Sequence, residues 1–284
     1  MDSKTIMTGL FGHPVGHSLS PLMHNQAFDV CRLNYRYAPF DIPPEQIGQA
    51  VAGIRALGFR GVNVTIPHKV AVMPYLDEVD EEAKIIGAVN TIVNDNGRLI
   101  GYNTDGRGYV RSLIEETGIV LEEQSVLMVG AGGAARGVAV ALLQKGVVDL
   151  VIANRSFDKA ESLANDLQSA IPGKRVTAIS LEEIGSSISK RTLLVQTTSI
   201  GMSPKVSESP VPKDLLHKNL LISDLIYNPL KTQIQKDGEE IGCRTHSGVG
   251  MFIYQGALSF EYWTNHKAPI EEMRKVVMSK LEMR

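Results

Sequence analysis

Apolar and polar positions alternate along the chain in a way that predicts two series of strands and helices. In the first series, extended apolar segments are followed by stretches with helical spacing, which is typical of an α/β layer domain. Its extended segments cover residues 6–11, 35–42 and 62–66, and its helices cover residues 21–30 and 44–57. The second series is typical of a doubly wound parallel sheet, with strands over residues 125–129, 149–153, 176–179, 193–197 and 220–225.

A strong turn signal separates two short extended segments, residues 91–93 and 99–102. The turn reads Asn94-Asp95-Asn96-Gly97, and because Asn and Gly tolerate positive φ, we expect a hairpin that closes the first sheet. Three further helices are predicted, over residues 106–116, 251–263 and 270–281. The pattern alone allows the last two helices to cover either domain.

The composition favours a soluble protein that acts on small molecules. The 284 residues are 43% hydrophobic and 21% charged, and the net charge is −2 with both signs interspersed. We therefore expect two globular domains, no nucleic-acid partner and no membrane partner. No apolar run approaches the roughly 20 residues of a membrane span, which predicts a cytoplasmic location. Cys31 and Cys243 lie far apart without metal-ligand spacing, which favours two reduced thiols.

A glycine-rich run in the middle of the chain predicts a phosphate-binding turn. Gly130-Ala131-Gly132-Gly133-Ala134-Ala135 follows an apolar strand and opens a helix. Such a turn presents backbone N–H groups at a helix N-terminus, and the small Ala135 allows close packing of helix and strand. By itself the run fits equally well a turn that only connects a strand to a helix.

The end of the next strand suggests which dinucleotide this turn would hold. NAD-binding proteins usually carry an Asp or Glu there, which accepts hydrogen bonds from the ribose 2′-hydroxyl. Here the strand runs into Asn154-Arg155-Ser156, with Lys159 one helical turn further on. Because Arg and Lys would pair with a 2′-phosphate, the sequence predicts NADP(H) as the cofactor.

A polar loop follows the first predicted strand. It contains Ser18 and Ser20, two residues apart, just before Pro21 and a predicted helix. Two hydroxyls that converge on a helix N-terminus can hold a substrate carboxylate. For Ser20 alone, the simpler interpretation is an N-cap with Pro21 at the first helical position, and both roles are compatible.

Two strand-to-helix corners carry residues suited to proton transfer. Asn63-Val64-Thr65-Ile66-Pro67-His68-Lys69 places Asn63 and Thr65 on one face of a strand and Lys69 on the helix that begins at Pro67. Asp105 stands at the second corner, and Asn90 leads into the hairpin before it. A lysine in a cleft can act as an acid or a base when a carboxylate supports its charge. A surface position for Lys69 and an N-cap role for Asp105 are the alternatives.

Other chemistries lack their key residues. His13, His17, His24 and His68 fall in the first quarter of the chain. We expect no metal site, because His13 and His17 lie on a Pro/Gly loop without a nearby carboxylate or Cys. The chain has no G-x-S-x-G elbow and no P-loop lysine, which argues against hydrolases and kinases.

With these motifs in place, the chain closely resembles the shikimate dehydrogenase family, which reduces 3-dehydroshikimate to shikimate with NADPH in the shikimate pathway of aromatic amino-acid biosynthesis. The resemblance extends over nearly the whole chain. It rests on residues 12–28, 63–69, 87–91 and 101–106, on the Gly130 turn, on Asn154-Arg155-Ser156 and on residues 248–256.

The resemblance implies roles for individual residues. Lys69 and Asp105 would be the catalytic pair, with Lys69 donating a proton to the developing alkoxide. The substrate carboxylate would be held by Ser18, Ser20 and Tyr227, and the substrate hydroxyls by Asn63, Thr65, Asn90 and Gln255. The implied NADP contacts are Gly130, Ala131, Gly132, Gly133, Ala134, Ala135, Asn154, Arg155, Ser156, Lys159, Thr198, Ser199, Met202, Gly248 and Met251.

The resemblance also implies a discontinuous first domain. Residues 1–104 plus 247–284 would form the substrate-binding and catalytic domain, with the C-terminal helices returning to it, and residues 105–246 the Rossmann-like NADP domain. The sequence does not decide the assembly, for which a homodimer is one candidate. Two departures from the family lie near the cofactor. Gln196-Thr197-Thr198 stands where the family often has Asn-Ala-Thr, and Ser247-Gly248 where Asp-Gly is common.

Two other functions stay open. One is a quinate/shikimate dehydrogenase that uses NAD, against which Arg155 argues. The other is a module that binds NADP(H) without catalysis, and the presence of both Lys69 and Asp105 argues against it.

Overall fold

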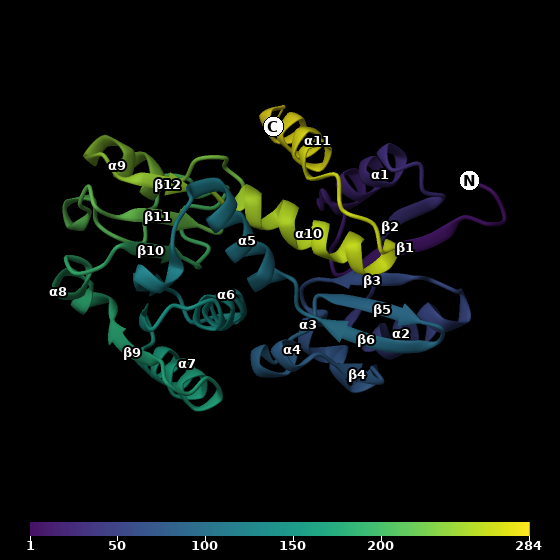
Figure 1. Cartoon of the computed structure of the whole chain (residues 1–284), viewed down its shortest axis with the longest axis horizontal. Coiled ribbons are helices and arrows are strands. Elements are labelled where there is room, and N and C mark those ends of the chain that lie inside the picture. Colours follow the sequence, from purple (N-terminus) through teal and green to yellow (C-terminus); the bar gives the residue numbers. More distant parts are fainter. Residues whose placement is uncertain (284) are drawn as a thin grey trace. The chain divides into compact units, whose positions relative to one another are not determined.

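The computed structural model describes residues 1–283 and divides the chain into two compact units. Unit 1 comprises residues 1–104 and the chain from residue 253 onward, and unit 2 comprises residues 105–252. Figure 1 follows this path along the sequence, with the yellow C-terminal helices labelled α10 and α11. The second division falls after Phe252, inside the continuous helix α10 (Gly248–Thr264), whereas the sequence suggested a boundary after residue 246.

Unit 1 is built on a six-stranded mixed sheet in the order β2-β1-β3-β5-β6-β4. The strands β1 and β2 pair in parallel, as do β1 and β3, while β3, β5 and β6 pair antiparallel. The strands are β1 (Ile6–Gly12), β2 (Tyr35–Asp41), β3 (Gly61–Val64), β4 (Glu78–Val79), β5 (Thr91–Asp95) and β6 (Arg98–Tyr102).

The predicted hairpin is formed by β5 and β6. Asn96 and Gly97 both have positive φ, and the Asn94 side chain accepts a hydrogen bond of 2.7 Å from Gly97 N. Such a turn matches the twist of the strands it joins. The hairpin does not close the sheet, however, because β4 pairs with the outer side of β6. This strand has only two residues, too few to give a periodic signal in the sequence.

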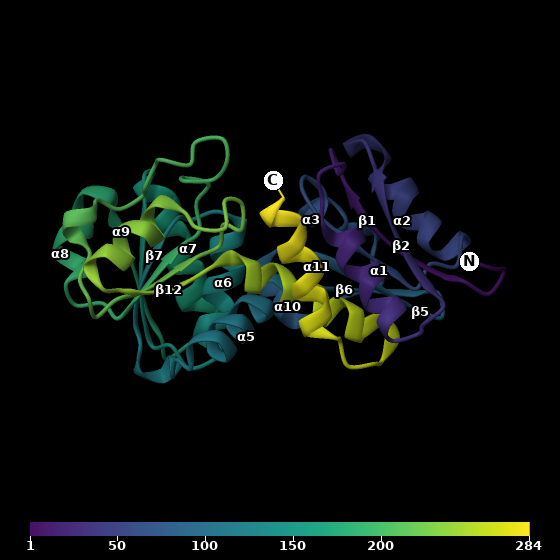
Figure 2. The same ribbon diagram turned by 90° about the horizontal axis from the view of Figure 1, so that it is seen from above.

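Helices α1 and α11 lie side by side in unit 1, and α10 contributes its C-terminal half to the same unit (Figures 1 and 2). Phe28 of α1 stacks on Phe260 of α10, and Trp263 donates a hydrogen bond of 3.0 Å to Ile92 O in β5. The C-terminal helices therefore complete the core of unit 1. Its helices are α1 (Ser20–Val30), α2 (Ile47–Ala56), α3 (His68–Ala71), α4 (Glu81–Ile86), part of α10, and α11 (Ile270–Glu282).

Unit 2 contains the predicted doubly wound sheet. All six strands are parallel, in the order β12-β11-β10-β7-β8-β9. The strands are β7 (Ser125–Val129), β8 (Asp149–Asn154), β9 (Arg175–Ser180), β10 (Leu193–Gln196), β11 (Leu221–Asp224) and β12 (Arg244–His246). The helices are α5 (Asp105–Thr117), α6 (Gly133–Gln144), α7 (Phe157–Ala170), α8 (Ile184–Ile188) and α9 (Gln233–Ile241).

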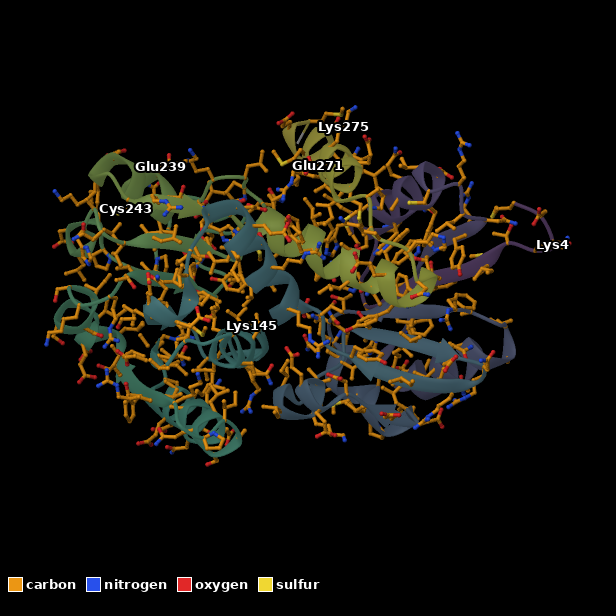
Figure 3. All side chains as sticks on the ribbon, viewed as in Figure 1. Lys4, Lys145, Glu239, Cys243, Glu271 and Lys275 are labelled. Carbon is orange, nitrogen blue, oxygen red and sulfur yellow. The ribbon has the colours of Figure 1, made fainter. Side chains whose placement is uncertain are left out.

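Five short 3₁₀ segments connect the elements in the described chain. They cover Pro44–Gln46 and Met73–Tyr75 in unit 1, and Leu121–Glu123, Leu181–Glu183 and Lys213–Leu215 in unit 2. Apolar side chains fill the layers in both units (Figure 3). Cys243, one of the labelled residues, is buried and its Sγ lies 3.2 Å from His217 O, while Cys31 is partly exposed; both are free cysteines.

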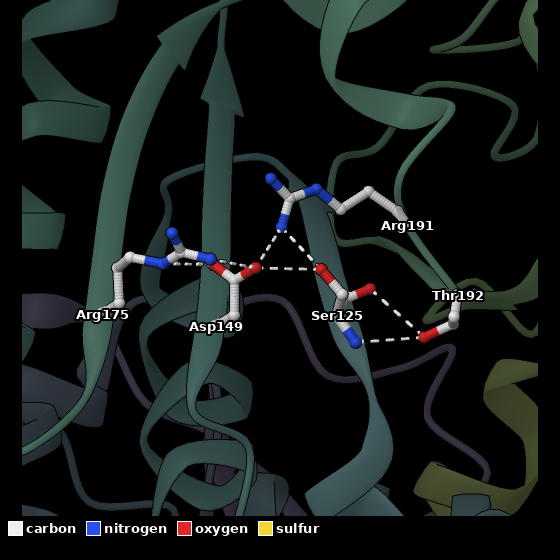
Figure 4. Close-up of polar contacts among 5 residues, drawn as sticks. All are labelled: Ser125, Asp149, Arg175, Arg191 and Thr192. Carbon is white, nitrogen blue, oxygen red and sulfur yellow. Dashed lines mark hydrogen bonds and ion pairs between the residues drawn. The ribbon is translucent and has the colours of Figure 1, made fainter.

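An ionic cluster fixes the amino ends of the strands in unit 2. Asp149, the first residue of β8, lies between Arg175 and Arg191, which both bind its carboxylate (Figure 4). Ser125 of β7 donates a hydrogen bond of 3.0 Å to the same carboxylate and accepts one of 2.7 Å from Arg191. Because parallel strands present their carboxyl ends at the opposite edge, this cluster leaves that edge to the glycine-rich turn.

No helix among residues 1–283 is both long and apolar enough to span a membrane.

Burial of His24 makes the stability of unit 1 sensitive to acid. The imidazole is fully buried and stacks on Tyr37 with ring centroids 4.5 Å apart. Desolvation lowers the pKa of His24 to about 3, against a smaller opposing effect of Asn63. Below pH 6.5 the unfolded chain therefore binds a proton that the folded chain does not, so stability falls as the pH falls.

We expect His24→Phe to remove this dependence. Between pH 7.5 and pH 5, the wild-type free energy of unfolding should fall by about 2 kcal/mol more than that of the variant. Urea unfolding of both proteins at the two pH values measures the difference. Equal losses in the two proteins would contradict a neutral buried imidazole.

Candidate active site

The two predicted carboxylate-binding serines lie next to each other in unit 1. Ser18 follows β1, and its Oγ accepts a hydrogen bond of 3.2 Å from Ser20 N. Ser20 is buried and is the first residue of α1, whose N-cap position is occupied by Leu19. The N-cap interpretation of Ser20 is therefore wrong by one residue. Leu19 has no side chain that could cap the helix, and the Ser18 hydroxyl accepts from the first helical N–H group instead.

Asn63 lies at the centre of a buried polar network. Its Oδ1 accepts a hydrogen bond of 3.0 Å from the Tyr37 hydroxyl, and its Nδ2 donates to Thr91 Oγ1 at 3.1 Å and to Ser259 Oγ at 2.9 Å. Burial raises the pKa of Tyr37, while a side-chain hydrogen bond with Ser20 lowers it. Asn63 Nδ2 also donates to Asn90 O at 3.3 Å, and because this carbonyl can only accept, whereas the three hydroxyls can donate or accept, it fixes the orientation of the Asn63 amide.

Asn90 and Gln255 join the same network. The Asn90 side chain donates to Thr104 Oγ1 at 3.0 Å and accepts from Thr104 N at 2.8 Å. The Ser259 hydroxyl contacts Thr91 Oγ1 at 2.9 Å and Gln255 O at 3.0 Å. Unit 1 thus gathers polar residues from β3, the start of the hairpin and α10, far apart in the sequence.

Lys69 is attached to this cluster through the backbone. It lies on the short helix α3, and its carbonyl accepts a hydrogen bond of 2.8 Å from Val89 N, the residue before Asn90. Thr65 N bonds Phe11 O at 2.9 Å, and Thr65 O accepts from His68 N at 2.9 Å. Both predicted residues are half-buried, and the surrounding hydrogen bonds fix the backbone from which they project.

Asp105 is the first residue of α5 in unit 2. The helix dipole favours a carboxylate in the first turn. The next residue, Gly106, packs against α6, since a Cβ on it would lie 2.3 Å from Gly137 O. A glycine is needed at this close helix contact, so the position of Asp105 is tied to the helix that follows the glycine-rich turn.

The glycine-rich turn has the geometry of a phosphate cradle. Gly130 has φ +114°, which favours glycine, and its N–H binds Ala153 O at 2.8 Å. Gly132 is the N-cap of α6 and offers no side-chain cap. A Cβ on Gly132 or Gly133 would lie in open space, whereas Ala135 is fully buried. The helix N-terminus thus faces an open side that suits an anion.

The basic residues after β8 lie on the exposed side of unit 2. Asn154 ends β8, and its side chain donates 2.9 Å to Ser156 O, which fixes the following turn. Ser156 is the N-cap of α7, and Lys159 N bonds Ser156 O at 3.2 Å. Arg155, Ser156 and Lys159 are exposed. No carboxylate stands at the end of this strand, so the local charge favours a phosphate.

Tyr227, Gly248 and Met251 come together after β11. Gly248 N bonds Ile226 O at 3.2 Å, and a Cβ on Gly248 would lie 2.1 Å from Leu225 O, so a side chain does not fit there. Tyr227 stacks on Phe252, the residue after Met251, with centroids 5.1 Å apart. Thr198, Ser199 and Met202 form the loop after β10, in which Ser199 and Met202 are exposed.

A buried carboxylate supports the segment that carries Tyr227. Asp224 ends β11 and accepts hydrogen bonds from Ile226 N at 2.9 Å and Thr232 Oγ1 at 2.7 Å. Burial raises the pKa of Asp224 to about 6, although these two hydrogen bonds lower it. Asp224, Tyr37 and Ser259 belong to none of the predicted motifs. Their one signal in the sequence is that they are polar within apolar surroundings.

The histidines in the first quarter of the chain make separate contacts. His13 Nδ1 lies 2.7 Å from Asp41 Oδ1, so the expectation that no carboxylate lies near this loop is wrong: β2 brings Asp41 to it from 28 residues away. His68 Nε2 lies 2.7 Å from Ile42 O, and His24 stacks on Tyr37. Among residues 1–283, no three His, Cys, Asp or Glu side chains are grouped so that they could hold a metal ion.

Comparisons with known proteins find the same family for both units. Family models match residues 10–92 (Shikimate dehydrogenase substrate binding domain), 112–225 (Shikimate / quinate 5-dehydrogenase) and 248–278 (Shikimate 5'-dehydrogenase C-terminal domain). A Geobacillus kaustophilus protein named Shikimate dehydrogenase (NADP(+)) is 48% identical over 273 residues, which cover 96% of this chain and 98% of the relative. The chain belongs to the shikimate dehydrogenase family.

Solved structures of the family share this fold over the full length. A shikimate dehydrogenase solved in complex with NADP⁺ has a TM-score of 0.93 at 41% identity, covering 99% of this chain and 97% of that one. The shikimate 5-dehydrogenase of Listeria monocytogenes, solved with shikimate and NAD, has a TM-score of 0.93 at 34% identity, with 98% of each chain covered. The predicted fold class, with a Rossmann-like unit and an α/β unit that receives the C-terminal helices, is confirmed.

The contrast between Gly130 and Gly132 can be tested through stability. A Cβ on Gly130 would meet Thr197 Oγ1 at 2.3 Å in a backbone conformation with positive φ. We therefore expect Gly130→Ala to lower the free energy of unfolding by about 2 kcal/mol or more. Gly132→Ala is the matched control and should cost less than about 1 kcal/mol, because its φ of −89° suits alanine. Denaturant unfolding measures both, and equal losses would show that the predicted strain at Gly130 is wrong.

Proposed function

We propose that this protein is an NADP-dependent shikimate dehydrogenase that catalyses the reversible reduction of 3-dehydroshikimate to shikimate. One observation carries the proposal: the full-length similarity to relatives named Shikimate dehydrogenase (NADP(+)). The presence of both Lys69 and Asp105 supports an enzyme over a module that only binds the cofactor, because such a module needs no proton relay.

Unit 1 is the proposed substrate-binding and catalytic domain, and unit 2 the proposed NADP domain. In unit 1, the hydroxyls of Ser18 and Ser20 would bind the substrate carboxylate beside the N-terminus of α1. The substrate hydroxyls would be bound by Asn63, Thr65, Asn90 and Gln255. The fixed orientation of the Asn63 amide supports its part, because a preorganised group loses little freedom when it binds. Tyr227 is the third residue proposed to bind the substrate carboxylate.

The residues of unit 2 suit NADP(H). Gly132 and Gly133 leave room at the N-terminus of α6, so a pyrophosphate can approach the backbone N–H groups of residues 130–135. Arg155 and Lys159 are exposed beside the end of β8 and would pair with the 2′-phosphate, with Asn154 and Ser156 shaping the turn. Thr198, Ser199, Met202, Gly248 and Met251 would lie near the nicotinamide end.

In this proposal, the protein's own side chains carry out the proton transfer. When bound, NADPH supplies the hydride that reduces the C3 carbonyl. Lys69 would donate a proton to the oxygen at C3 as negative charge develops on it, and Asp105 would orient the ammonium group of Lys69. General acid catalysis of this kind typically contributes roughly 10²- to 10⁴-fold to the rate.

Several finer points belong to the same proposal. The substrate is a small molecule, and neither nucleic acid nor a membrane is a proposed partner. The two free cysteines support a reducing, cytoplasmic location. A homodimer is the assembly to test by light scattering.

A quinate/shikimate dehydrogenase that uses NAD is the second candidate function, favoured by the match to a Shikimate / quinate model.

Lys69→Ala should abolish most of the turnover without loss of substrate binding. We expect kcat to fall by about 10² or more, because no other group is proposed to protonate the C3 oxygen. The Kd of shikimate, measured by calorimetry, should change by less than about fivefold. Lys84→Ala is the control, since Lys84 is paired with Glu81 on α4 of the same unit. Unchanged turnover in Lys69→Ala would contradict the role of this lysine.

Arg155 should decide the choice between the two nicotinamide cofactors. We expect the wild-type protein to prefer NADPH over NADH with 3-dehydroshikimate, and Arg155→Gln to raise the KM for NADPH by about ten- to a hundredfold, as for lost hydrogen bonds to a charged group. Its KM for NADH should stay within about twofold.

Arg175→Gln, at the opposite edge of the same sheet, is the control for the loss of a positive charge. Steady-state assays in both directions, with shikimate and quinate as substrates of oxidation, also separate the second candidate. Equal use of NADH and NADPH by the wild type would rule out the predicted role of Arg155.

A further inference from the structure

The side chain of Gln196 holds the loop after β10 through two hydrogen bonds. The residue is fully buried at the end of this strand. Its Nε2 donates a hydrogen bond of 2.9 Å to Ile200 O, and its Oε1 accepts one of 2.8 Å from Thr198 N. One side-chain amide therefore binds both sides of the loop backbone, and both halves of the amide are satisfied.

Thr197 joins the loop to the glycine-rich turn. Its N–H and its hydroxyl both donate to Val129 O, at 2.9 Å and 2.8 Å. The same Oγ1 would lie 2.3 Å from a Cβ on Gly130, so the hydroxyl occupies the space that a side chain would need there. The threonine thus holds the carboxyl ends of β7 and β10 together at the start of the turn.

The outer part of the loop is ordered by its own hydrogen bonds. Thr198 Oγ1 accepts from Ile200 N at 3.1 Å, and Met202 N bonds Ser199 O at 3.2 Å. Gly201 has φ +89°, as a tight turn requires. Ser199 and Met202 remain exposed on this turn, while Gln196 lies beneath it.

We propose that Gln196 and Thr197 are positioning residues for NADP(H): they hold the loop of residues 198–202 and the Gly130 turn in the arrangement that binds the cofactor. The inference rests on the proposed function. Neither side chain is placed against the cofactor itself, because the hydrogen bonds of both end on the backbone of the two loops.

The two residues make contacts that Asn and Ala could not make in the same way. An asparagine at position 196 is one methylene shorter than the glutamine that binds both Thr198 N and Ile200 O. An alanine at position 197 has no hydroxyl to bind Val129 O, so a chain with alanine there lacks this bond between the carboxyl ends of β7 and β10.

Variants of β10 provide a matched test. Thr197→Val and Gln196→Met keep the side-chain size but remove the hydrogen bonds, and Thr197→Ser restores the hydroxyl. Thr192→Val is the control, because Thr192 Oγ1 accepts from Ser125 N at 3.0 Å at the other end of the same strand, beside the same neighbour β7. Titration of the intrinsic or NADPH fluorescence gives the Kd of NADPH, and steady-state assays give the KM of NADP⁺ and of shikimate.

We expect Thr197→Val to raise the Kd of NADPH about fivefold and Gln196→Met about tenfold or more relative to Thr192→Val. The KM of NADP⁺ should rise in parallel, the KM of shikimate should stay within about twofold, and Thr197→Ser should behave like the wild type. A merely structural role would lower the melting temperature of Thr197→Val and Thr192→Val alike without this split.

Failure of the positioning role and failure of the proposed function would give different results. If the wild type oxidises shikimate with NADP⁺ but Thr197→Val and Thr192→Val bind NADPH equally well, the positioning role is wrong and the proposed function stands. If the wild type neither binds NADPH nor turns over, both are overturned. Should Gln196→Met fail to fold, the comparison of the two threonine variants with Thr197→Ser decides.

Discussion

The pairing of β7 with β10 is the constraint on which the architecture of unit 2 depends. The chain leaves β7 toward β8 and β9 and later returns to place β10 on the other side of β7, so the strand order reverses at this point. Connections on the two sides of β7 then run in opposite directions, and their first turns separate at the carboxyl edge. The turn at Gly130 and the loop after Thr197 are these two connections. Their close contact, where only a hydrogen fits on Gly130, ties the glycine-rich turn to the neighbouring strand.

The substrate half depends on a different kind of interaction. Its centre is a group of buried hydroxyl and amide side chains whose hydrogen bonds run from Tyr37 through Asn63 to Thr91 and Ser259. A buried polar group without a partner is costly, so such a network is stable only when it is nearly complete. When the network is complete, its hydrogen bonds fix which side-chain atoms face away from it. The group is therefore rigid as a whole, and this rigidity depends on all of its hydrogen bonds more than on any single contact.

The sequence predicted those features whose signals are local. The Gly130 turn, Arg155 after β8 and the hairpin at Asn96 each depend on a few adjacent residues, and periodicity was enough for the parallel sheet. Ser259 was missed because it lies 196 residues from Asn63, so that only the fold shows the contact. The two-residue strand β4 was missed because it is too short for a pattern, and Leu19 was missed as the N-cap of α1 because serine is the better capping residue type. Gln196 stood out only as a departure from the family, and its hydrogen bonds explain it.

The discontinuity of unit 1 bears on how the protein is made. Unit 2 is one uninterrupted segment, residues 105–252, and all its strands and helices have been synthesised when Phe252 is added. Unit 1 is begun first but finished last, since Phe260 and Trp263 complete an aromatic core whose other members lie before residue 93. Because domains generally fold as units during synthesis, unit 2 is complete in sequence while unit 1 still lacks these two side chains. The part of the unit 1 core that packs on Phe260 and Trp263 is completed only after residues 105–252 have been translated.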